Sequence, residues 1–324
     1  MAGAATAPEL LRASWREGPC ANRLQLFLAT TASRVFILPG GRGELALVHN
    51  PGRQSAKRPA ANGMPPVLRE WSESGFNFFR APAEEIVLRP ADSFFVLVNA
   101  FPIVHDHFLL VSTEKLPQVV HSGTDRFLAN VLDFFVKGGF VNSWIALFNS
   151  FGAFASVNHL HVQIMPHPLD GPDHLLRLET ARLALRQAFS WGGLMVPNEP
   201  GFRCIVLELS GLDFLGNFAA ALHRILAILA DQDIAHNWVT LRSDALFRIA
   251  ILPRSLKQAA CPGASLEPGG LELLGMLVVY DQGTFEGLGE AEYDCLRASV
   301  ELTQPRFENL LVKHVVPALD VPPG

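Results

Sequence analysis

The sequence has 324 residues, of which 49% are hydrophobic and 18% are charged, and its formal net charge is −5. This composition excludes a disordered chain, and the negative charge gives no basic face for a nucleic-acid duplex. The length allows two domains, or one large domain built from two halves.

The cysteines and the apolar segments indicate the compartment. The cysteines lie far apart without a CxxC pair, which disfavours a zinc ribbon and a disulfide framework and favours a reducing compartment; they are Cys20, Cys204, Cys261 and Cys295. The amino end has no basic region leading into an apolar run, and the apolar stretch FAAALHRILAILA is too short and too charged to span a bilayer. We therefore expect a cytoplasmic protein without a membrane role.

The first half of the chain begins with a loop and continues as alternating strands and a helix. The loop at 51–66 is rich in Pro and Gly, and its Arg53, Lys57 and Arg58 form either a solvated basic segment or a phosphate contact. Short apolar runs with β-branched or aromatic residues predict strands at 93–100, 107–112, 144–150 and 159–166. Apolar residues at helical spacing predict a helix at 124–139, which ends at two glycines.

The second half shows a similar order of elements. We expect a helix at 174–189, a strand at 202–209, a helix at 214–233, strands at 237–242 and 247–254, and a final helix at 290–312 that Pro305 interrupts. The sequence therefore predicts an α+β protein with two related halves, 1–168 and 169–324, each with an antiparallel sheet and packed helices.

Two His-x-His patterns occur, at 105/107 and 159/161, and the second has an informative setting. In NSFGAFASVNHLHVQIMP a strand, a small-residue turn with Gly152 and a second strand follow one another. The period of two places His159, His161 and Gln163 on one face. Alternatively, these histidines decorate the solvent face of a half-buried strand, or they ligate zinc, for which Gln163 is a poor third ligand.

The stretch ASVNHLHVQ resembles the active-site motif of the galactose-1-phosphate uridylyltransferase branch of the histidine-triad superfamily, in which Gln replaces the third histidine. NPGRQSAKRP, GFNFFRA, NAFPIVHDHFLLV and LFNSFGAFASVNHLHVQ are similar to segments of the GDP-hexose phosphorylases. The resemblance implies a histidine-triad-like α+β fold. It departs from the family at Arg80, where lysine is usual, and at Asp106, where glycine is usual.

The resemblance also implies roles for individual residues. His161 is the expected nucleophile, and His159 supports its orientation. The expected contacts to the α-phosphate are Gln163, Ser156 and Asn149, and the small residues from Gly152 onward let backbone amides approach it. The same pocket is expected to include Asn77, Arg80 and His107.

This chemistry needs a nucleophile that is neutral near pH 7 and later leaves easily, and imidazole, with a pKa of about 6.5, meets both demands. Its second nitrogen must donate to a fixed acceptor. Gln163 offers an amide donor and moves no proton, which favours phosphate, already an anion, over water as acceptor.

Other histidines and cations are secondary candidates. His105 is expected in a turn and His167 in a surface loop, while His236 either caps a helix end or reaches the pocket. Arg242, Arg254 and Lys257 follow strands of the second half, and at least one is expected to meet an anion, with Arg254 as the candidate.

These expectations amount to a nucleotidyltransferase that converts GDP-glucose or a related GDP-hexose and inorganic phosphate to GDP and hexose 1-phosphate. The alternatives are a dinucleoside tetraphosphate (Ap4A) phosphorylase, a hexose-1-phosphate uridylyltransferase, and a nucleotide-binding protein without turnover. We expect neither cofactor nor metal, no nucleic-acid partner, and a monomer or homodimer.

Overall fold

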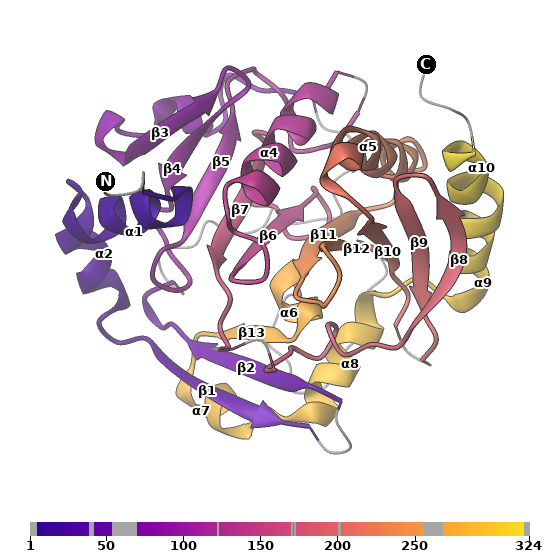
Figure 1. Ribbon diagram of the computed structural model, residues 1–324. Coiled ribbons are helices and arrows are strands. Elements are labelled where there is room, and N and C mark those ends of the chain that lie inside the picture. The colour runs from indigo at the N-terminus through magenta and orange to yellow at the C-terminus, as the bar shows by residue number, and fades with distance from the viewer. Residues whose placement is uncertain are drawn as a thin grey trace.

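A computed structural model describes residues 5–38, 42–53, 70–121, 123–169, 171, 173–199, 202–255 and 268–320. The described strands form a ten-stranded sheet in the order β3-β4-β5-β7-β6-β11-β12-β10-β9-β8 and a smaller sheet in the order β1-β2-β13 (Figure 1). The loop expected at 51–66 lies mostly outside the described residues.

The first half of the chain supplies five strands of the large sheet and one helix that packs on it. They are β3 (Ile86–Ala91), β4 (Phe94–Val98), β5 (Phe108–Ser112), α4 (Asp125–Lys137), β6 (Trp144–Asn149) and β7 (His161–Pro166). The strands and the helix expected between 93 and 166 are thus confirmed. Before them lie α1 (Ala7–Glu17), α2 (Ala21–Leu28), β1 (Ala32–Ile37), β2 (Glu44–His49), η2 (Phe78–Arg80) and η3 (Ala83–Glu85).

The second half repeats this order with β8 (Leu183–Phe189), β9 (Gly192–Pro197), β10 (Ile205–Leu209), α5 (Leu215–Asp231), β11 (His236–Leu241) and β12 (Phe247–Pro253). A 3₁₀ turn, η4 (Leu212–Phe214), precedes α5. The chain continues as α6 (Gly270–Leu274), β13 (Met276–Val279), α7 (Gln282–Gly287), α8 (Glu290–Val300), α9 (Gln304–Leu310), the π-helical turn Leu311–Val315 and α10 (Val316–Leu319). As expected, the last helix is interrupted, and Pro305 lies in the first turn of α9.

The two sets of five strands have the same topology. In each set the third strand, β5 or β10, is followed by a helix and then by the fourth strand, β6 or β11, which lies at the centre of the sheet. The fifth strand, β7 or β12, lies between the third and the fourth. The sets meet at β6 and β11, where Phe148 pairs with Trp238 and their rings stack with centroids 6.2 Å apart. The α+β fold class is confirmed, but the two expected sheets are joined edge to edge into one. The boundary at residue 168 stays a prediction.

The smaller sheet connects the two ends of the chain. β2 pairs antiparallel with β1 and parallel with β13, with Leu47 opposite Leu277. Figure 1 shows this sheet below the large one, with α7 and α8 beside it. A strand of the first half is therefore held in place by a strand that ends near residue 280.

The large sheet buries its two faces differently. On one face α4 and α5 pack over side chains such as Val96, Leu110 and Val162 in a large apolar core (Figure 1). On the other face the alternate residues, among them Leu97 and Leu109, pack with the segment around Phe78. Because successive residues of a strand point to opposite faces, His161 and Gln163 of β7 belong to this second face.

The helix expected at 174–189 is wrong. Leu176 bridges to Glu44 of β2, and 183–189 form the edge strand β8, in which exposed and half-buried residues follow one another. The leucine spacing and the strong helix formers of this segment favour a helix locally, but pairing with β9 prevails.

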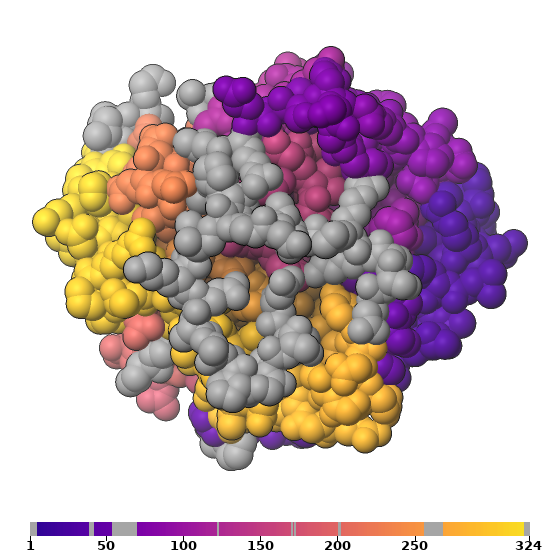
Figure 2. Space-filling model, turned by 180° about the vertical axis from the view of Figure 1, so that it is seen from behind, coloured from indigo at the N-terminus to yellow at the C-terminus, as the bar shows by residue number. Residues whose placement is uncertain are grey.

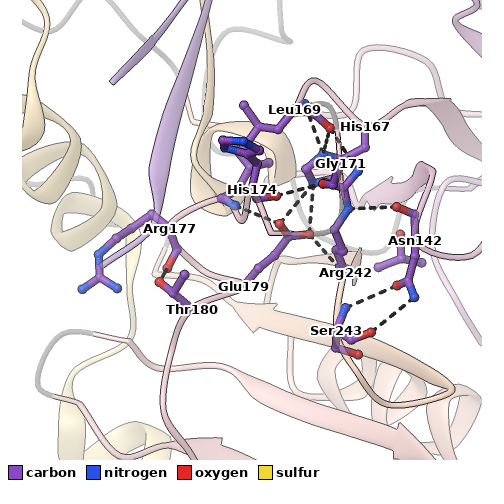
Figure 3. Close-up of polar contacts among 12 residues, drawn as sticks. Asn142, His167, Leu169, Gly171, His174, Arg177, Glu179, Thr180, Arg242 and Ser243 are labelled. Carbon is purple, nitrogen blue, oxygen red and sulfur yellow. Dashed lines mark hydrogen bonds and ion pairs between the residues drawn. The ribbon is translucent and has the colours of Figure 1, made fainter. Parts of the chain in front are cut away.

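A buried polar cluster holds the connection between the two halves (Figure 3). The His167 Nε2 lies 3.1 Å from Glu179 Oε2, with both side chains almost fully enclosed, so the expectation of a surface histidine is wrong. The buried Arg242 guanidinium donates to the carbonyl oxygens of Leu169, Gly171, His174 and Asn142, so Arg242 closes a loop instead of facing an anion site.

Two further features concern the compartment. The helix Leu212–Asp231 is long and apolar enough to cross a membrane by length and composition, but because one side of it packs into the core it is weak evidence for a membrane segment. Cys20 and Cys204 are free and buried, whereas Cys295 is disulfide-bonded, a bond that the cysteine spacing did not indicate.

Replacing Arg242 with Ala should destabilise the protein by about 3 kcal/mol, because several buried carbonyl groups would lose a charged donor. Urea denaturation of the wild type and the variant measures this difference. Arg248→Ala is the control, since its ion pair with Glu208 is partly exposed and contributes about 0–1 kcal/mol. Equal losses in the two variants would contradict the anchoring role of Arg242.

Candidate active site

The site begins where two neighbouring strands separate. β6 and β7 are paired only as far as Leu147 and Gln163. Beyond this pair the buried Gln118 takes the place of a strand: its Nε2 donates to the carbonyl oxygens of Asn149 and His161, each at 3.0 Å, and its Oε1 accepts from the His161 amide at 2.8 Å. Gln118 therefore fixes the backbone of His161 against the end of β6.

The ring of His161 is held in a single tautomer. Its Nδ1 lies 2.7 Å from the carbonyl oxygen of His159, an acceptor only, so Nδ1 carries the proton and donates. Nε2 therefore keeps its lone pair, and His161 lines a cavity on the sheet face opposite α4 and α5. Burial lowers the pKa of His161 to about 4, so that the ring is neutral at pH 7.

His159 precedes the strand and lies on the same side of the sheet, but it is not part of the cavity lining. It is fully buried against the rings of Trp71, Phe78 and Phe79. Its Nδ1 accepts from the Phe78 amide at 3.2 Å and its Nε2 donates to the Ser112 carbonyl at 3.0 Å. Both nitrogens are thus committed to the backbone, which leaves none for a metal.

His107 determines which end of the Gln163 amide faces the cavity. Its Nδ1 accepts from the Ile103 amide at 3.0 Å, so the proton is on Nε2, which donates to Gln163 Oε1 at 3.1 Å. Burial, and next the charge of Arg53, lower the pKa of His107 to about 3, which keeps the ring neutral. The Gln163 amide nitrogen remains as a donor at the cavity.

Asn149 is oriented in the same way from the second half. Its Oδ1 accepts from Asn237 Nδ2 at 2.7 Å and from the Gly270 amide at 3.1 Å, which leaves its amide nitrogen for the cavity. The buried Arg254 donates to Asn237 Oδ1 at 3.2 Å and to the Pro268 carbonyl, and does not line the cavity. Arg254 therefore holds Asn237 in place, and Asn237 in turn orients Asn149.

The turn between β6 and β7 places Ser156 at the cavity. Gly152 has φ 77° and Phe154 has φ 83°, so the turn uses left-handed conformations that glycine adopts most easily. Ser156 is exposed and lines the cavity, whereas Gly152 does not. Asp106, at the position where the family usually has glycine, also has a positive φ of 58°.

The other candidates lie elsewhere. The buried Asn77 begins the turn that carries Phe78, and the exposed Arg80 donates to the Glu73 carbonyl; neither lines the cavity. Arg53 does line it, while Lys57, Arg58 and Lys257 lie outside the described residues. His105 lies in a turn, and His236 donates to the Ile234 carbonyl beyond α5, away from the cavity.

The cavity walls come from distant parts of the chain. Phe78, Leu97 and Leu109 belong to the first half, and Leu271, Glu272, Val278 and Tyr280 come from α6, β13 and the residue after it. Seen from the opposite side to Figure 1, residues of the first half in magenta lie between purple and orange-yellow parts of the chain (Figure 2). Sequence reasoning missed Glu272 and the buried Glu85 of this cavity, and also Gln118, which holds the His161 backbone without lining the cavity, since isolated polar residues carry no pattern.

Four buried histidines make stability depend on pH. Burial lowers the pKa of His159, His161 and His236 to about 4 and of His107 to about 3. Between these values and the unfolded pKa of about 6.5 only the unfolded chain binds these protons, so stability falls as the pH falls, by about 1.4 kcal/mol per pH unit for each histidine.

Urea denaturation between pH 7 and pH 5 measures this slope. His236→Asn should lower this slope by the contribution of one histidine, about 1.4 kcal/mol per pH unit. His236 suits this test because it is buried and does not line the cavity. A stability that stays constant from pH 7 to pH 5 would contradict neutral burial of these rings.

Comparison with known proteins connects this geometry to a family. Residues 8–165 match the model of the GDPGP1-like N-terminal domain. GDP-L-galactose phosphorylase 2 of Arabidopsis thaliana is 25% identical, over 86% of this chain and 69% of its own length. GDP-D-glucose phosphorylase 1 of Danio rerio is 27% identical, over 70% of this chain and 63% of its own length.

A solved structure shows the same fold. Yeast Ap4A phosphorylase Apa2 in complex with Ap4A superposes with a TM-score of 0.60 over 87% of this chain and 97% of its own, at 18% identity. The histidine-triad-like fold is thereby confirmed. Residues 8–165 are thus similar to the GDPGP1-like N-terminal domain, and the chain is similar to GDP-L-galactose and GDP-D-glucose phosphorylases.

Proposed function

We propose that this protein is a nucleotidyltransferase that phosphorolyses a GDP-hexose, with GDP-D-glucose as the first substrate to test. The observation that carries the proposal is the His161 ring, which donates through Nδ1 to a backbone carbonyl, keeps Nε2 unprotonated and lines the cavity. The similarity to GDP-D-glucose and GDP-L-galactose phosphorylases supports the choice of substrate.

The reaction has two steps. His161 Nε2 attacks the α-phosphorus of the GDP-hexose, and the bond from this phosphorus to the bridging oxygen breaks, which releases hexose 1-phosphate and leaves GMP on the histidine. An oxygen of inorganic phosphate then attacks the same phosphorus and displaces His161, which gives GDP. Imidazole suits both steps, since it is a neutral nucleophile at pH 7 and a good leaving group.

The amides of Gln163 and Asn149 stabilise the charge that develops on the α-phosphate. Each has its oxygen occupied inside the protein, so each presents an N–H donor whose orientation is set before substrate binds. Such preorganised donors stabilise a transition state without reorganisation. Ser156 of the turn between β6 and β7 and Arg53 also line the cavity, and they supply a hydroxyl and a cation for the remaining phosphate oxygens.

The proposal extends to the surroundings of the reaction. The partners are a nucleotide sugar and inorganic phosphate, without nucleic acid or membrane, and the protein acts in the cytoplasm as a monomer or homodimer. The halves 1–168 and 169–324 act together, because the second half supplies Asn237 behind the site.

A donor screen tests the proposal against its rivals. GDP-, ADP- and UDP-glucose and Ap4A are each incubated with the protein and phosphate, and we expect GDP-glucose to react fastest. Faster turnover of Ap4A indicates a dinucleoside tetraphosphate phosphorylase, and turnover of UDP-glucose only with a hexose 1-phosphate acceptor indicates a uridylyltransferase. Reversible binding without turnover indicates a binding protein.

His161→Asn should lower turnover by roughly 10⁴ or more, because a covalent nucleophile is lost. It should also abolish the acid-labile labelling that GDP-glucose with a labelled nucleotide gives in the absence of phosphate. His174→Asn is the matched control, since His174 is exposed and paired with Glu44. An adduct that still forms on the His161 variant would show that another residue is the nucleophile.

Gln163→His should lower the rate of phosphorolysis and raise the ratio of GMP to GDP among the products. Water needs a general base, whereas phosphate arrives as an anion, so a titratable group helps water most, by at most about 10²- to 10⁴-fold. Nucleotide chromatography separates GMP, the product of hydrolysis, from GDP. An unchanged ratio would mean that Gln163 does not determine the acceptor.

A further inference from the structure

A row of residues crosses the sheet from the reacting histidine toward β3. Gln163 on β7 lies opposite Leu109 on β5, Leu109 opposite Leu97 on β4, and Leu97 opposite Ile86 on β3. Residues opposite each other on neighbouring strands point to the same face, and each step is about 4.8 Å, so the row extends about 14 Å from Gln163. This is the scale of one nucleotide.

The cavity changes character along this row. At the His161 end its donors are the amides of Gln163 and Asn149, and the Phe78 ring lies there too, with its centroid 5.0 Å from that of His161. From Gln163 toward β3 the row is apolar, with Leu109 and Leu97 lining the cavity, and Phe76 lines it beside Phe78. Phe76 and Phe78 meet edge to face, with ring centroids 5.7 Å apart. A flat heteroaromatic ring between apolar walls is the ligand part that fits this end.

One carboxylate lies at the apolar end. Glu85 ends η3, immediately before Ile86, is 6% exposed and lines the cavity. Its Oε1 accepts from Arg23 Nη2 at 2.6 Å, whereas its Oε2 accepts from none of the residues that the structure describes. A buried carboxylate needs donors on both oxygens, so the second oxygen is available for a ligand.

Among the described residues that line the cavity, the other carboxylate is already engaged. Glu272 Oε2 accepts from the Gly269 amide at 2.8 Å at the start of α6, on the wall next to Leu271. Glu85 is therefore the carboxylate placed to recognise the far end of a nucleotide whose phosphate is at His161.

We propose that Glu85 selects guanine by accepting hydrogen bonds from its N1–H and its 2-amino group. Guanine presents two adjacent donors on this edge, which an acceptor-only carboxylate complements. Adenine presents an acceptor at N1, which a carboxylate repels, and uracil has one N–H between two carbonyl oxygens. This inference rests on the proposed function only in placing the α-phosphate at His161.

Nucleotide binding tests the inference without turnover. Calorimetry with GMP, IMP and AMP should show the wild type binding GMP most tightly. IMP, which lacks the 2-amino group, should bind about tenfold more weakly because one hydrogen bond to a charged group is lost. Glu85→Gln should weaken GMP by about 10- to 100-fold, since its amide places a donor against a donor, and should leave AMP unchanged or bound more tightly.

Two variants serve as controls. Glu84→Gln makes the same substitution at the exposed neighbouring residue and should leave all three affinities unchanged. Arg23→Gln removes the ion pair but keeps the carboxylate, and should retain the preference for GMP over AMP.

The outcomes separate the inference from the proposed function. Wild-type affinity for GMP in Glu85→Gln, equal binding of GMP and AMP by the wild type, or loss of the preference in Arg23→Gln would each overturn the role of Glu85. Failure of the wild type to phosphorolyse any nucleotide sugar would instead overturn the proposed function, while GMP selectivity that depends on Glu85 would still support guanine recognition.

Discussion

The site depends on a side chain that replaces backbone pairing. β6 and β7 separate beyond Leu147 and Gln163, and Gln118 bridges them with three hydrogen bonds to backbone groups. Gln118 fills the gap between the two strand ends and prevents the His161 backbone from moving away, while the side chains of His161 and Asn149 line the cavity. Without such a bridge, unpaired buried amides and carbonyls would have to be solvated in the cavity.

The strand pattern was enough to place His161 and Gln163 on one face, because HLHVQIMP alternates with a period of two and Leu160 and Val162 lie in the core behind them. The same pattern was insufficient for His159, which precedes the strand and is covered by aromatic side chains from 71–79. Burial of that kind depends on a segment some 80 residues away in sequence, and no local periodicity encodes it.

Contacts between separate elements also explain the wrong predictions. The segment 174–189 has good helix formers, yet β2 and β9 offer it backbone partners. His167 lies between two prolines and resembles a loop residue, but its side chain is buried in contact with the buried carboxylate of Glu179. Arg254 was expected to contact an anion and instead supports Asn237. Glu179 and Asn237 lie only 12 and 17 residues away in sequence, and β9 begins directly after the turn that ends β8. The periodicity of one segment does not show whether its residues pair with a neighbouring segment or with a ligand.

The position of β13 has a consequence for how the protein is made. Leu271, Glu272, Val278 and Tyr280 complete the cavity wall, and β13 is held by the parallel strand β2 near the other end of the chain. On the ribosome, the segment with His161 and Gln163 emerges more than a hundred residues before this wall exists. A growing chain therefore carries its reactive histidine without the pocket that would retain a nucleotide beside it, and the complete pocket forms only once translation has passed Tyr280.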